Sequence, residues 1–400
     1  MEQESAKEYG RGGLPYIEPG ECLAKEFYVI RKLGCGNFSV VWLCWHATKL
    51  RFYAVKIVKS LWKYRVMAKD EIKAFILQRT VNVKEIVEYA GSFMLRRNGE
   101  HVCIVTEVLG ENMLYAIDNI PNERRVRVVK LVTRCLLRGL AALEKRHVVH
   151  TDIKPENLLF TKPELVTCFE ALDIIEKMLK RRWLPKDALS AVATSRIVRM
   201  TMQKTRDLQR CKAQIEKRKD HLEQSTNTEV VGIKIADLGN AVIQDYRLRG
   251  VIQTMQYRSP ESVLRLGFDY TTDVFSAACT IFEWATGDYL FDVPNKTSPL
   301  DESKDLLTRL TLVVGDLPHE VLRHGLSYRE LFDEEGHLKR PAGFSGVDEP
   351  PKALYDILVE VHGWDPKAAQ GFARFLLMML RLDPTKRPTA KECLQHQWLS

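Results

Sequence analysis

The alternation of apolar and polar residues predicts a strand-rich segment over residues 27–107. The stretches IRKLG and VVWLC flank a glycine-containing loop and alternate like the two strands of a hairpin, and YAVKIV continues the pattern. One predicted helix interrupts the strands, from Lys69 to about Arg79. A Gly- and Pro-containing extension, residues 1–26, precedes this segment.

Beyond residue 107 the period of the apolar residues becomes helical. They recur at helical spacing through most of residues 108–160 and again after Ser262. The pattern therefore predicts an α+β chain, with a β-rich N-terminal lobe over residues 27–107 and a helical C-terminal lobe over residues 108–400.

An insert, residues 161–230, interrupts the helical lobe. It holds 15 Lys/Arg and 10 Asp/Glu, and so contributes +5 of the chain's net charge of +8. Pro185 separates two predicted helices, the second from about Asp187 to Leu222. The apolar face predicted for the first helix comprises Leu165, Phe169, Leu172, Ile175 and Leu179. The pattern favours a solvated helical spacer, with a docking or localisation element as the alternative.

Residues 147–159 read HVVHTDIKPENLL and place three polar side chains at a characteristic spacing. Asp152, Lys154 and Asn157 match the catalytic loop of protein kinases. There the aspartate accepts a hydroxyl proton, the lysine faces the moving phosphate and the asparagine holds a metal ion. The loop departs from the pattern at Thr151, because kinases commonly have arginine before the aspartate.

Further kinase motifs occur in the expected order. The glycine-rich loop LGCGNFSVVW contains Gly34 and Gly36, which let the backbone approach phosphates. Lys56 in YAVKIV fits the strand lysine that pairs with the nucleotide phosphates, and Glu71 is its expected partner. Asp237 in IKIADLGN fits the metal-binding aspartate. The series ends with YRSPE at 257–261, Asp273 and Arg387, and we expect Glu261 and Arg387 to form a buried structural ion pair.

These motifs predict a bilobal protein-kinase fold, with a helical insert between the catalytic loop and DLG and with ATP bound between the lobes. Residues 106–109 would form the hinge, with Thr106 at the back of the pocket and the backbones of Glu107 and Leu109 against adenine. The apolar pocket residues would be Leu33, Val41, Ala54 and Leu159.

Composition fits such an enzyme in a reducing compartment. The chain has no apolar run near the roughly 20 residues of a membrane span. Its N-terminus, MEQESAKEYG, lacks the apolar core of a signal peptide. Nine scattered cysteines without a CxxC pair suggest neither disulfides nor a zinc site, so we expect the cytoplasm and nucleus. We expect a monomer that binds neither membranes nor nucleic acid directly.

Together the motifs resemble one family, the SR-protein kinases, which phosphorylate serines in Arg/Ser-rich splicing factors. The resemblance covers nearly the whole chain and rests on HTDIKPEN, IADLGNA, IQTMQYRSPE, FEWATGDYLF and the long insert. It implies that Asp152 deprotonates a serine hydroxyl, and that Lys154 stabilises the transferring phosphoryl group. It also implies that Asn157 and Asp237 hold Mg²⁺, and that Thr254 hydrogen-bonds near Asp152.

Two features bear on regulation and substrate. Threonine at 151 leaves no cation for an activation-loop phosphate to neutralise, so we expect activity without such phosphorylation. Residues 281–335 carry twelve Asp/Glu and five Lys/Arg, a net charge of −7 on a basic chain. This charge suits Arg-rich substrates. The resemblance implies docking carboxylates at Asp301, Glu302 and Asp305.

Two alternatives stay open. One is a broader basophilic Ser/Thr kinase of the same group, such as a dual-specificity splicing kinase, although these generally keep arginine where Thr151 stands. The other is a pseudokinase scaffold, against which the presence of Lys56, Asp152 and Asp237 argues.

Overall fold

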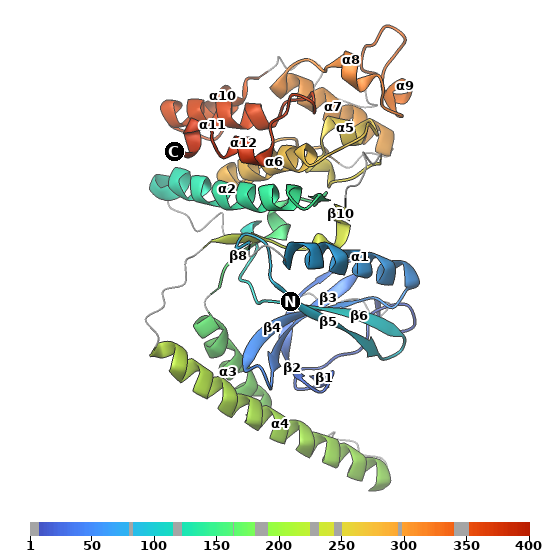
Figure 1. Cartoon of the computed structure of the whole chain (residues 1–400), viewed down its shortest axis with the longest axis vertical. Helices are drawn as coiled ribbons and strands as arrows, with labels where there is room; N and C mark the ends of the chain where they lie inside the picture. Colours follow the sequence, from blue (N-terminus) through green and yellow to red (C-terminus); the bar gives the residue numbers. More distant parts are fainter. Residues whose placement is uncertain are drawn as a thin grey trace. The chain divides into compact units, whose positions relative to one another are not determined.

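The chain divides into two compact units, described here in a computed structural model (Figure 1). The strand unit comprises Met1–Arg79, Val87–Gly110 and Thr161–Val231, and the helical unit comprises Thr80–Ile86, Glu111–Phe160 and Gly232–Ser400. The structure describes residues 8–79, 83–114, 122–162, 164–180, 191–224, 232–243, 250–294, 298–339 and 352–400. The insert therefore groups with the strands, whereas the sequence pattern placed it within the helical lobe.

A six-stranded antiparallel sheet forms the centre of the strand unit, with the order β1-β2-β3-β4-β6-β5. Its strands are β1 Cys22–Leu23, β2 Phe27–Gly36, β3 Ser39–His46, β4 Arg51–Val58, β5 Tyr89–Arg96 and β6 Glu100–Thr106. The pairing of Gly36 with Ser39 closes the predicted hairpin, and Lys56 on β4 lies opposite Val41 on β3. Alternate side chains of each strand therefore point to opposite faces.

One face of the sheet packs against the N-terminal extension. Leu14, Ile17 and Leu23 join Phe27, Val55 and other apolar strand residues in a single buried cluster. The backbone N–H of Leu61 donates to the carbonyl of Gly12, and that of Ser60 to the carbonyl of Gly13. The extension predicted as residues 1–26 is thus, over its described part, integral to the strand unit.

Helix α1, Trp62–Arg79, begins seven residues before the predicted start at Lys69. Its buried side chains include Ala68, Ala74 and Phe75, and Phe75 stacks on Tyr89 with ring centroids 5.4 Å apart. The first turns expose apolar side chains to solvent, so they lack the buried periodicity that predicts a helix.

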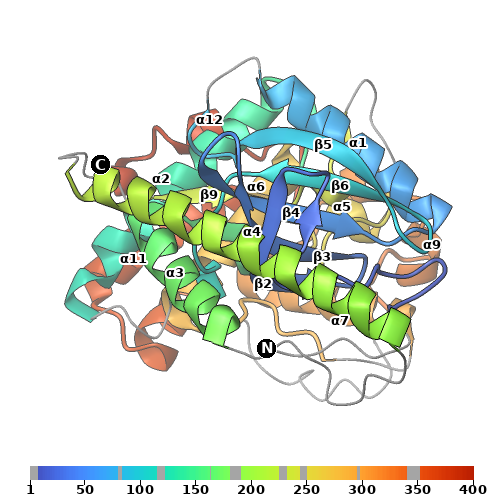
Figure 2. The ribbon, with the colours of Figure 1, turned by 90° about the horizontal axis from the view of Figure 1, so that it is seen from below.

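The two insert helices, α3 Glu164–Lys180 and α4 Ala191–Glu223, cover the other face of the sheet (Figure 2). A buried cluster joins five strand residues to seven insert residues: Tyr28, Ile30, Leu43, Trp45 and Phe52 with Cys168, Ala171, Ile175, Met178, Leu208, Cys211 and Ile215. The spacer interpretation was therefore wrong in one respect, because one side of each helix is buried rather than solvated.

Polar contacts fix the insert on the sheet. The indole N–H of Trp45 donates to the side-chain oxygen of Gln214 at 2.9 Å. Glu170 of α3 accepts from Arg31 at 3.3 Å and from Lys162 at 2.6 Å. These groups are fully or partly shielded from water, which strengthens each bond and orients α3 along β2.

The buried face of α3 agrees with the predicted face only in part, since Ile175 is fully buried and Leu172 and Leu179 are partly buried against the same cluster. Cys168, Ala171, Ile175 and Met178 point into the sheet, whereas Phe169 is 51% exposed, with Lys219 of α4 over its ring at 5.3 Å. Small and flexible side chains allow the helix to approach the aromatic strand residues closely. The prediction followed the largest apolar residues, so it missed Cys168 and Ala171 and wrongly included Phe169. Leu165 has no described side chain, and Pro185 and the first predicted residues of the second helix lie outside the described ranges.

The helical unit surrounds α6, Thr271–Thr286, whose residues 271–285 are all buried. Its other α-helices are α2 Asn122–Glu144, α5 Pro260–Val263, α7 Pro299–Val314, α8 His319–Leu322, α9 Tyr328–Leu331, α10 Leu354–Asp356, α11 Pro366–Met379 and α12 Ala390–Cys393. Short strands and single turns complete it: β7 Val148–Val149, η3 Pro155–Asn157, β8 Leu158–Phe160, β9 Ile233–Ile235, η4 Leu238–Asn240, β10 Val242–Ile243, η5 Met255–Tyr257, η6 Ile357–Val361 and η7 Gln397–Leu399. None of the described helices has the length and apolar character that a membrane crossing requires.

Candidate active site

In the strand unit, Lys56 and Glu71 form the predicted ion pair. The Lys56 ammonium lies 2.8 Å and 3.0 Å from the two carboxylate oxygens of Glu71. Glu71 is only 3% exposed, so the pair fixes α1 relative to β4 in a region of reduced dielectric. In kinases this pair must be formed for catalysis.

The glycine-rich loop connects β2 and β3 beside open space. A Cβ atom added at Gly34 or Gly36 would meet no atom within 4 Å. At the tip of the loop, Phe38 stacks on Tyr64 of α1, with ring centroids 4.9 Å apart. Lys59 donates to the carbonyl of Asn37 at 2.6 Å. The loop is thus fixed to α1 at its tip while its glycines stay clear for a ligand.

The predicted adenine-binding residues of the strand unit lie on β2, β3, β4 and the hinge. Leu33 and Val41 are half-buried and Ala54 is buried. At the hinge, Thr106 donates its hydroxyl to the carbonyl of Glu107 at 3.2 Å. Leu109 lies three residues beyond the end of β6, outside the described helices and strands.

In the helical unit, Asp152 is the centre of a hydrogen-bonded array. The hydroxyl of Thr254 donates to Asp152 Oδ1 at 2.8 Å, and Lys154 Nζ lies 3.1 Å from that hydroxyl and 3.0 Å from Asp152 Oδ2. The amide of Asn157 donates to the carbonyl of Asp152 at 2.8 Å. The structure thus brings the four predicted catalytic residues together, with Thr254 in contact with both Lys154 and Asp152.

Thr151 contacts Asn240, the first residue after the DLG motif, directly. Its hydroxyl donates to the carbonyl of Asn240 at 2.8 Å. Its φ is +67°, which costs free energy for a β-branched residue. Asp273 holds this conformation, because its carboxylate accepts the N–H groups of His150 at 2.7 Å and Thr151 at 2.9 Å. Burial raises the pKa of Asp273 to about 6, although both N–H donors favour its ionised form.

Asn157 and Asp237 lie at the same end of the β8–β9 strand pair, whose strands the insert separates along the chain. The N–H of Ala236 donates to the carbonyl of Asn157 at 2.9 Å, and β8 is the strand on which the predicted pocket residue Leu159 pairs with Lys234. The side-chain amide of Asn157 donates to Asp152, which leaves its oxygen as an acceptor. Asp237 itself has a left-handed backbone, with φ of 57°, and accepts from the N–H of Gly239. Two oxygen ligands of this kind suit a hard divalent cation.

Gln253, which the sequence motifs did not single out, organises the segment that carries Thr254. Its amide nitrogen donates to the carbonyl of Thr272 at 2.9 Å and to Ser276 at 2.7 Å, and its oxygen accepts from Ser259. Its φ of +69° is the signal of a constrained position, and no residue pattern in the sequence reveals this backbone angle. Gln253 therefore positions Thr254 relative to α6.

A second buried polar contact supports the same segment. Tyr257 donates its hydroxyl to Glu283 at 2.5 Å. Burial raises the pKa of Glu283 to about 7, despite the Tyr257 hydrogen bond. Burial likewise raises the pKa of Tyr257.

Glu261 and Arg387 form the buried ion pair that the sequence predicted. Arg387 binds both carboxylate oxygens of Glu261, at 2.6 Å and 3.0 Å, and neither side chain exceeds 1% exposure. Burial alone would raise the pKa of Glu261, and the adjacent guanidinium outweighs it and lowers that pKa. The pair is structural, since it lies in the core rather than beside Asp152.

The predicted docking carboxylates at the start of α7 do not share one environment. Asp305 is fully buried and accepts from Arg309 at 2.6 Å, so it cannot meet a substrate directly. Its place on the inner face follows from the apolar residues around it, Leu306, Leu307 and Leu310. Asp301 pairs with Lys304 at 3.0 Å, and both Asp301 and Glu302 are partly exposed. Asp301 and Glu302 are therefore the accessible carboxylates of the predicted set.

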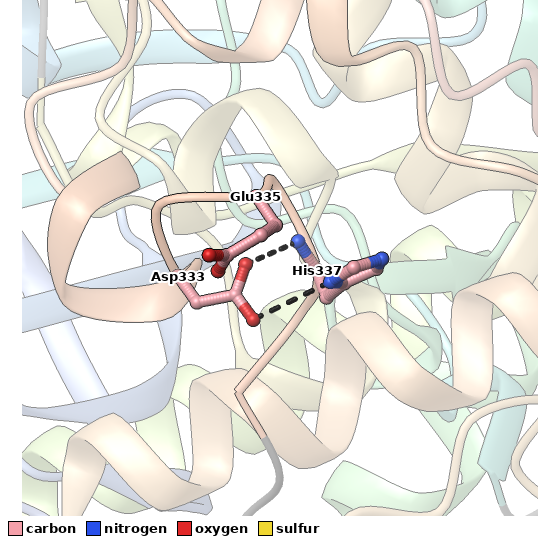
Figure 3. Close-up of side chains that lie close together, drawn as sticks. All are labelled: Asp333, Glu335 and His337. Atoms are coloured by element: carbon pink, nitrogen blue, oxygen red, sulfur yellow. Dashed lines mark hydrogen bonds and ion pairs between the residues drawn. The ribbon is translucent and has the colours of Figure 1, made fainter.

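Three further side chains, Asp333, Glu335 and His337, come together in the segment after α9 (Figure 3). Their ligand atoms lie within 4.8 Å of one another. The N–H of His337 donates to the Asp333 carboxylate at 2.7 Å, and the N–H of Asp333 donates back to the His337 carbonyl at 2.9 Å. These bonds close a tight turn on the surface, and that role accounts for the cluster.

The fold and these side chains define a Ser/Thr protein kinase, and comparison with known proteins agrees. Residues 27–169 and 219–399 match the protein kinase domain family. The chain aligns over its full length with the serine/threonine-protein kinase SRPK of Physarum polycephalum, at 32% identity and 92% coverage of that protein. The chain therefore belongs to the SR-protein kinase family.

Other similar proteins carry related names. SRSF protein kinase 3 of Mus musculus is 28% identical, over 100% of this chain and 91% of that protein. Protein kinase dsk1 of Schizosaccharomyces pombe is 29% identical, over 99% of this chain and 85% of that protein. A solved structure described as "Crystal structure of PF14_0431, kinase domain" superposes with a TM-score of 0.66 at 25% identity, over 96% of this chain and 98% of that one. Kinases of this class use ATP with a divalent metal ion.

Proposed function

We propose that this kinase phosphorylates serines in Arg/Ser-rich proteins of the splicing-factor type. The single observation that carries the proposal is the array of Asp152, Lys154 and Thr254, which has the contacts of a Ser/Thr kinase catalytic loop. The names of the relatives SRSF protein kinase 3 and SRPK supply the substrate class.

The chain's own side chains can perform the proton transfer. The Thr254 hydroxyl holds Asp152 Oδ1, so that the carboxylate is oriented to accept the proton of a serine hydroxyl. Lys154 offers a positive charge to the transferring phosphoryl group. We propose Mg²⁺ as the metal at Asn157 and Asp237, where it would neutralise charge on the β- and γ-phosphates.

We propose that activity does not need a phosphate on the activation segment. The Thr151 hydroxyl already holds the carbonyl of Asn240, and threonine carries no charge that a phosphate would neutralise. Recombinant protein treated with phosphatase should therefore keep its activity, and a complete loss of activity would contradict this part of the proposal.

For substrate docking we propose Asp301 and Glu302. Both are accessible on an acidic region, and carboxylates pair well with guanidinium groups. Replacing both with alanine should raise KM for an Arg/Ser peptide about three- to tenfold and leave KM for ATP unchanged. Ser303→Ala, a change at a partly exposed position on the same helix, is the matched control. An unchanged peptide KM would remove these residues from docking.

The decisive experiment compares phosphoryl transfer from radiolabelled ATP to an Arg/Ser-repeat peptide and to a basic peptide that lacks the repeat. A strong preference for the repeat is expected. Equal transfer to both would favour a broader basophilic kinase, and no transfer to either would favour a scaffold.

The expected cellular properties belong to the same proposal. We propose a monomer in the cytoplasm and nucleus that engages neither membranes nor nucleic acid directly. Imaging of the tagged full chain and sedimentation of the purified protein test these expectations.

A further inference from the structure

The first two turns of α1 expose an apolar surface on the strand unit. Trp62 is 70% exposed and Val66, one turn further along the same helix, is 46% exposed. Leu61, which precedes the helix, and Met94 of β5 lie beside them and are 44% and 45% exposed. Single exposed apolar residues are ordinary, whereas four around one helix end form a patch of the kind that marks an interaction site.

The surface at this patch is hollowed by two cavities of about 350 Å³ and 270 Å³. Both are lined by Trp62, Arg65 and Glu100, so they adjoin. The first volume lies at the lower end of the range that ligand sites occupy, roughly 300–1,000 Å³, and the second lies just below it. We call the two cavities together the α1 groove.

The rim of the α1 groove is basic. Arg11, Arg65 and Lys69 line it, and Glu100 is its one acidic lining residue among those described. Glu100 already forms an ion pair with Arg65 and lies 3.7 Å from Arg96. The lining side chains therefore carry a net charge of +2, which favours an acidic occupant.

We propose that the α1 groove binds an acidic peptide segment that carries bulky apolar side chains, supplied by a partner protein. The apolar side chains would cover Trp62 and Val66, and the flanking carboxylates would meet Arg11 and Lys69. An Arg/Ser-rich substrate has the wrong charge for this surface, so the partner is distinct from the substrate.

Helix α1 connects the groove to residues of the active site. Tyr64, in the first turn, stacks on Phe38 at the tip of the glycine-rich loop. Glu71, on the same helix, binds Lys56. An occupant that contacts the start of α1 therefore stabilises both contacts, and we expect it to lower KM for ATP.

The test uses the full chain and a fluorescent peptide, Glu-Asp-Phe-Leu-Asp-Phe-Glu, with Lys-Arg-Phe-Leu-Lys-Phe-Arg as the charge-reversed control peptide. Fluorescence anisotropy should show saturable binding of the acidic peptide alone. Val66→Glu should weaken it about tenfold by placing a like charge in the groove. Ile76→Glu is the matched control, since Ile76 is 51% exposed on the same helix and lines neither cavity, and it should bind as the parent protein does.

Several results of this experiment would contradict the proposal. Equal binding by Val66→Glu and the parent protein, preference for the basic peptide, or no binding at all would overturn the proposal. A dimer that Val66→Glu dissociates would assign the groove to a second copy. If a chain that lacks residues 1–7 bound the peptide tenfold more tightly, residues 1–7 would compete with the peptide, and the occupant of the α1 groove would be the protein's own N-terminus. Saturation without any change in KM for ATP would overturn the coupling through α1.

Discussion

The hydroxyl of Thr151 donates to the carbonyl of Asn240 at 2.8 Å and so links the catalytic loop to the segment that follows the DLG motif. Asn240 in turn lies 3.5 Å from Asp152 through its side-chain amide. A neutral side chain thus makes a contact that needs no added phosphate. Removing the Thr151 hydroxyl therefore tests the proposal of constitutive activity.

Thr151→Val should lower kcat on an Arg/Ser peptide about fivefold, because valine keeps the shape and loses one hydrogen bond worth about 1 kcal/mol. Steady-state kinetics measure the effect. Thr308→Val is the control, since the Thr308 hydroxyl donates within α7, to the carbonyl of Lys304. A Thr151→Val enzyme with the kcat of the parent protein would show that the contact is dispensable.

Thr254→Val should lower kcat about 10- to 100-fold, because Asp152 loses a donor and Lys154 loses an acceptor. KM for ATP should stay the same. Thr254→Ser retains the hydroxyl and should restore most of the rate. If serine and valine were equally impaired, the methyl group and its packing would be responsible instead.

Ile175→Ala should lower the free energy of unfolding by about 2–5 kcal/mol, because Ile175 is fully buried between α3 and the sheet. Phe169→Ala removes a larger side chain from the same helix and should cost about 1 kcal/mol or less, since Phe169 is half exposed. Urea unfolding monitored by circular dichroism gives both values. The reverse ranking would place Phe169, and not Ile175, against the strands.

Glu283→Gln should change how stability depends on pH. The pKa of Glu283 is raised to about 7 in the folded protein, so the folded state binds the proton more tightly than the unfolded state. The stability that Glu283 contributes through this tighter proton binding is fully present below about pH 4.5. It declines as the pH rises and is lost above about pH 7.

Glutamine stays neutral and still accepts from Tyr257. The stability of the variant relative to the parent protein should therefore increase between pH 5 and pH 7.5, by a few kcal/mol at most. Urea midpoints at the two pH values measure this. A constant difference across the range would mean that Glu283 titrates at an ordinary pKa.

Local motifs predicted which polar side chains of this chain lie in contact. Asp152, Lys154 and Asn157 lie within six residues, and a single loop conformation fixes their relation. Lys56 lies on a strand and Glu71 on a helix that the spacing of apolar residues predicted. The loop residues are predictable because their spacing determines which atoms can meet, whereas the contact of Lys56 with Glu71, 15 residues away on another element, was predicted from the kinase motif.

Tertiary packing decided the features that the sequence did not predict. Asp305 follows the acidic start of α7 and looks accessible in the sequence, yet the helix turns it inward with Leu306 and Leu310. Gln253 bonds to residues 6 to 23 positions away, so no short pattern marks it. The face that α3 buries depends on the aromatic strand residues it meets, which the helix sequence does not contain.

The insert also has a consequence for the order in which the chain can fold. Trp45 and Phe52 are synthesised early. Ile215, which covers the face of the sheet on which they lie, is synthesised about 160 residues later. At roughly 5–20 residues per second, a ribosome takes on the order of 10 to 30 s to make that stretch. During this interval the nascent sheet presents an uncovered aromatic face. The strand unit can therefore complete its core only after the catalytic loop, which belongs to the other unit, has already been synthesised.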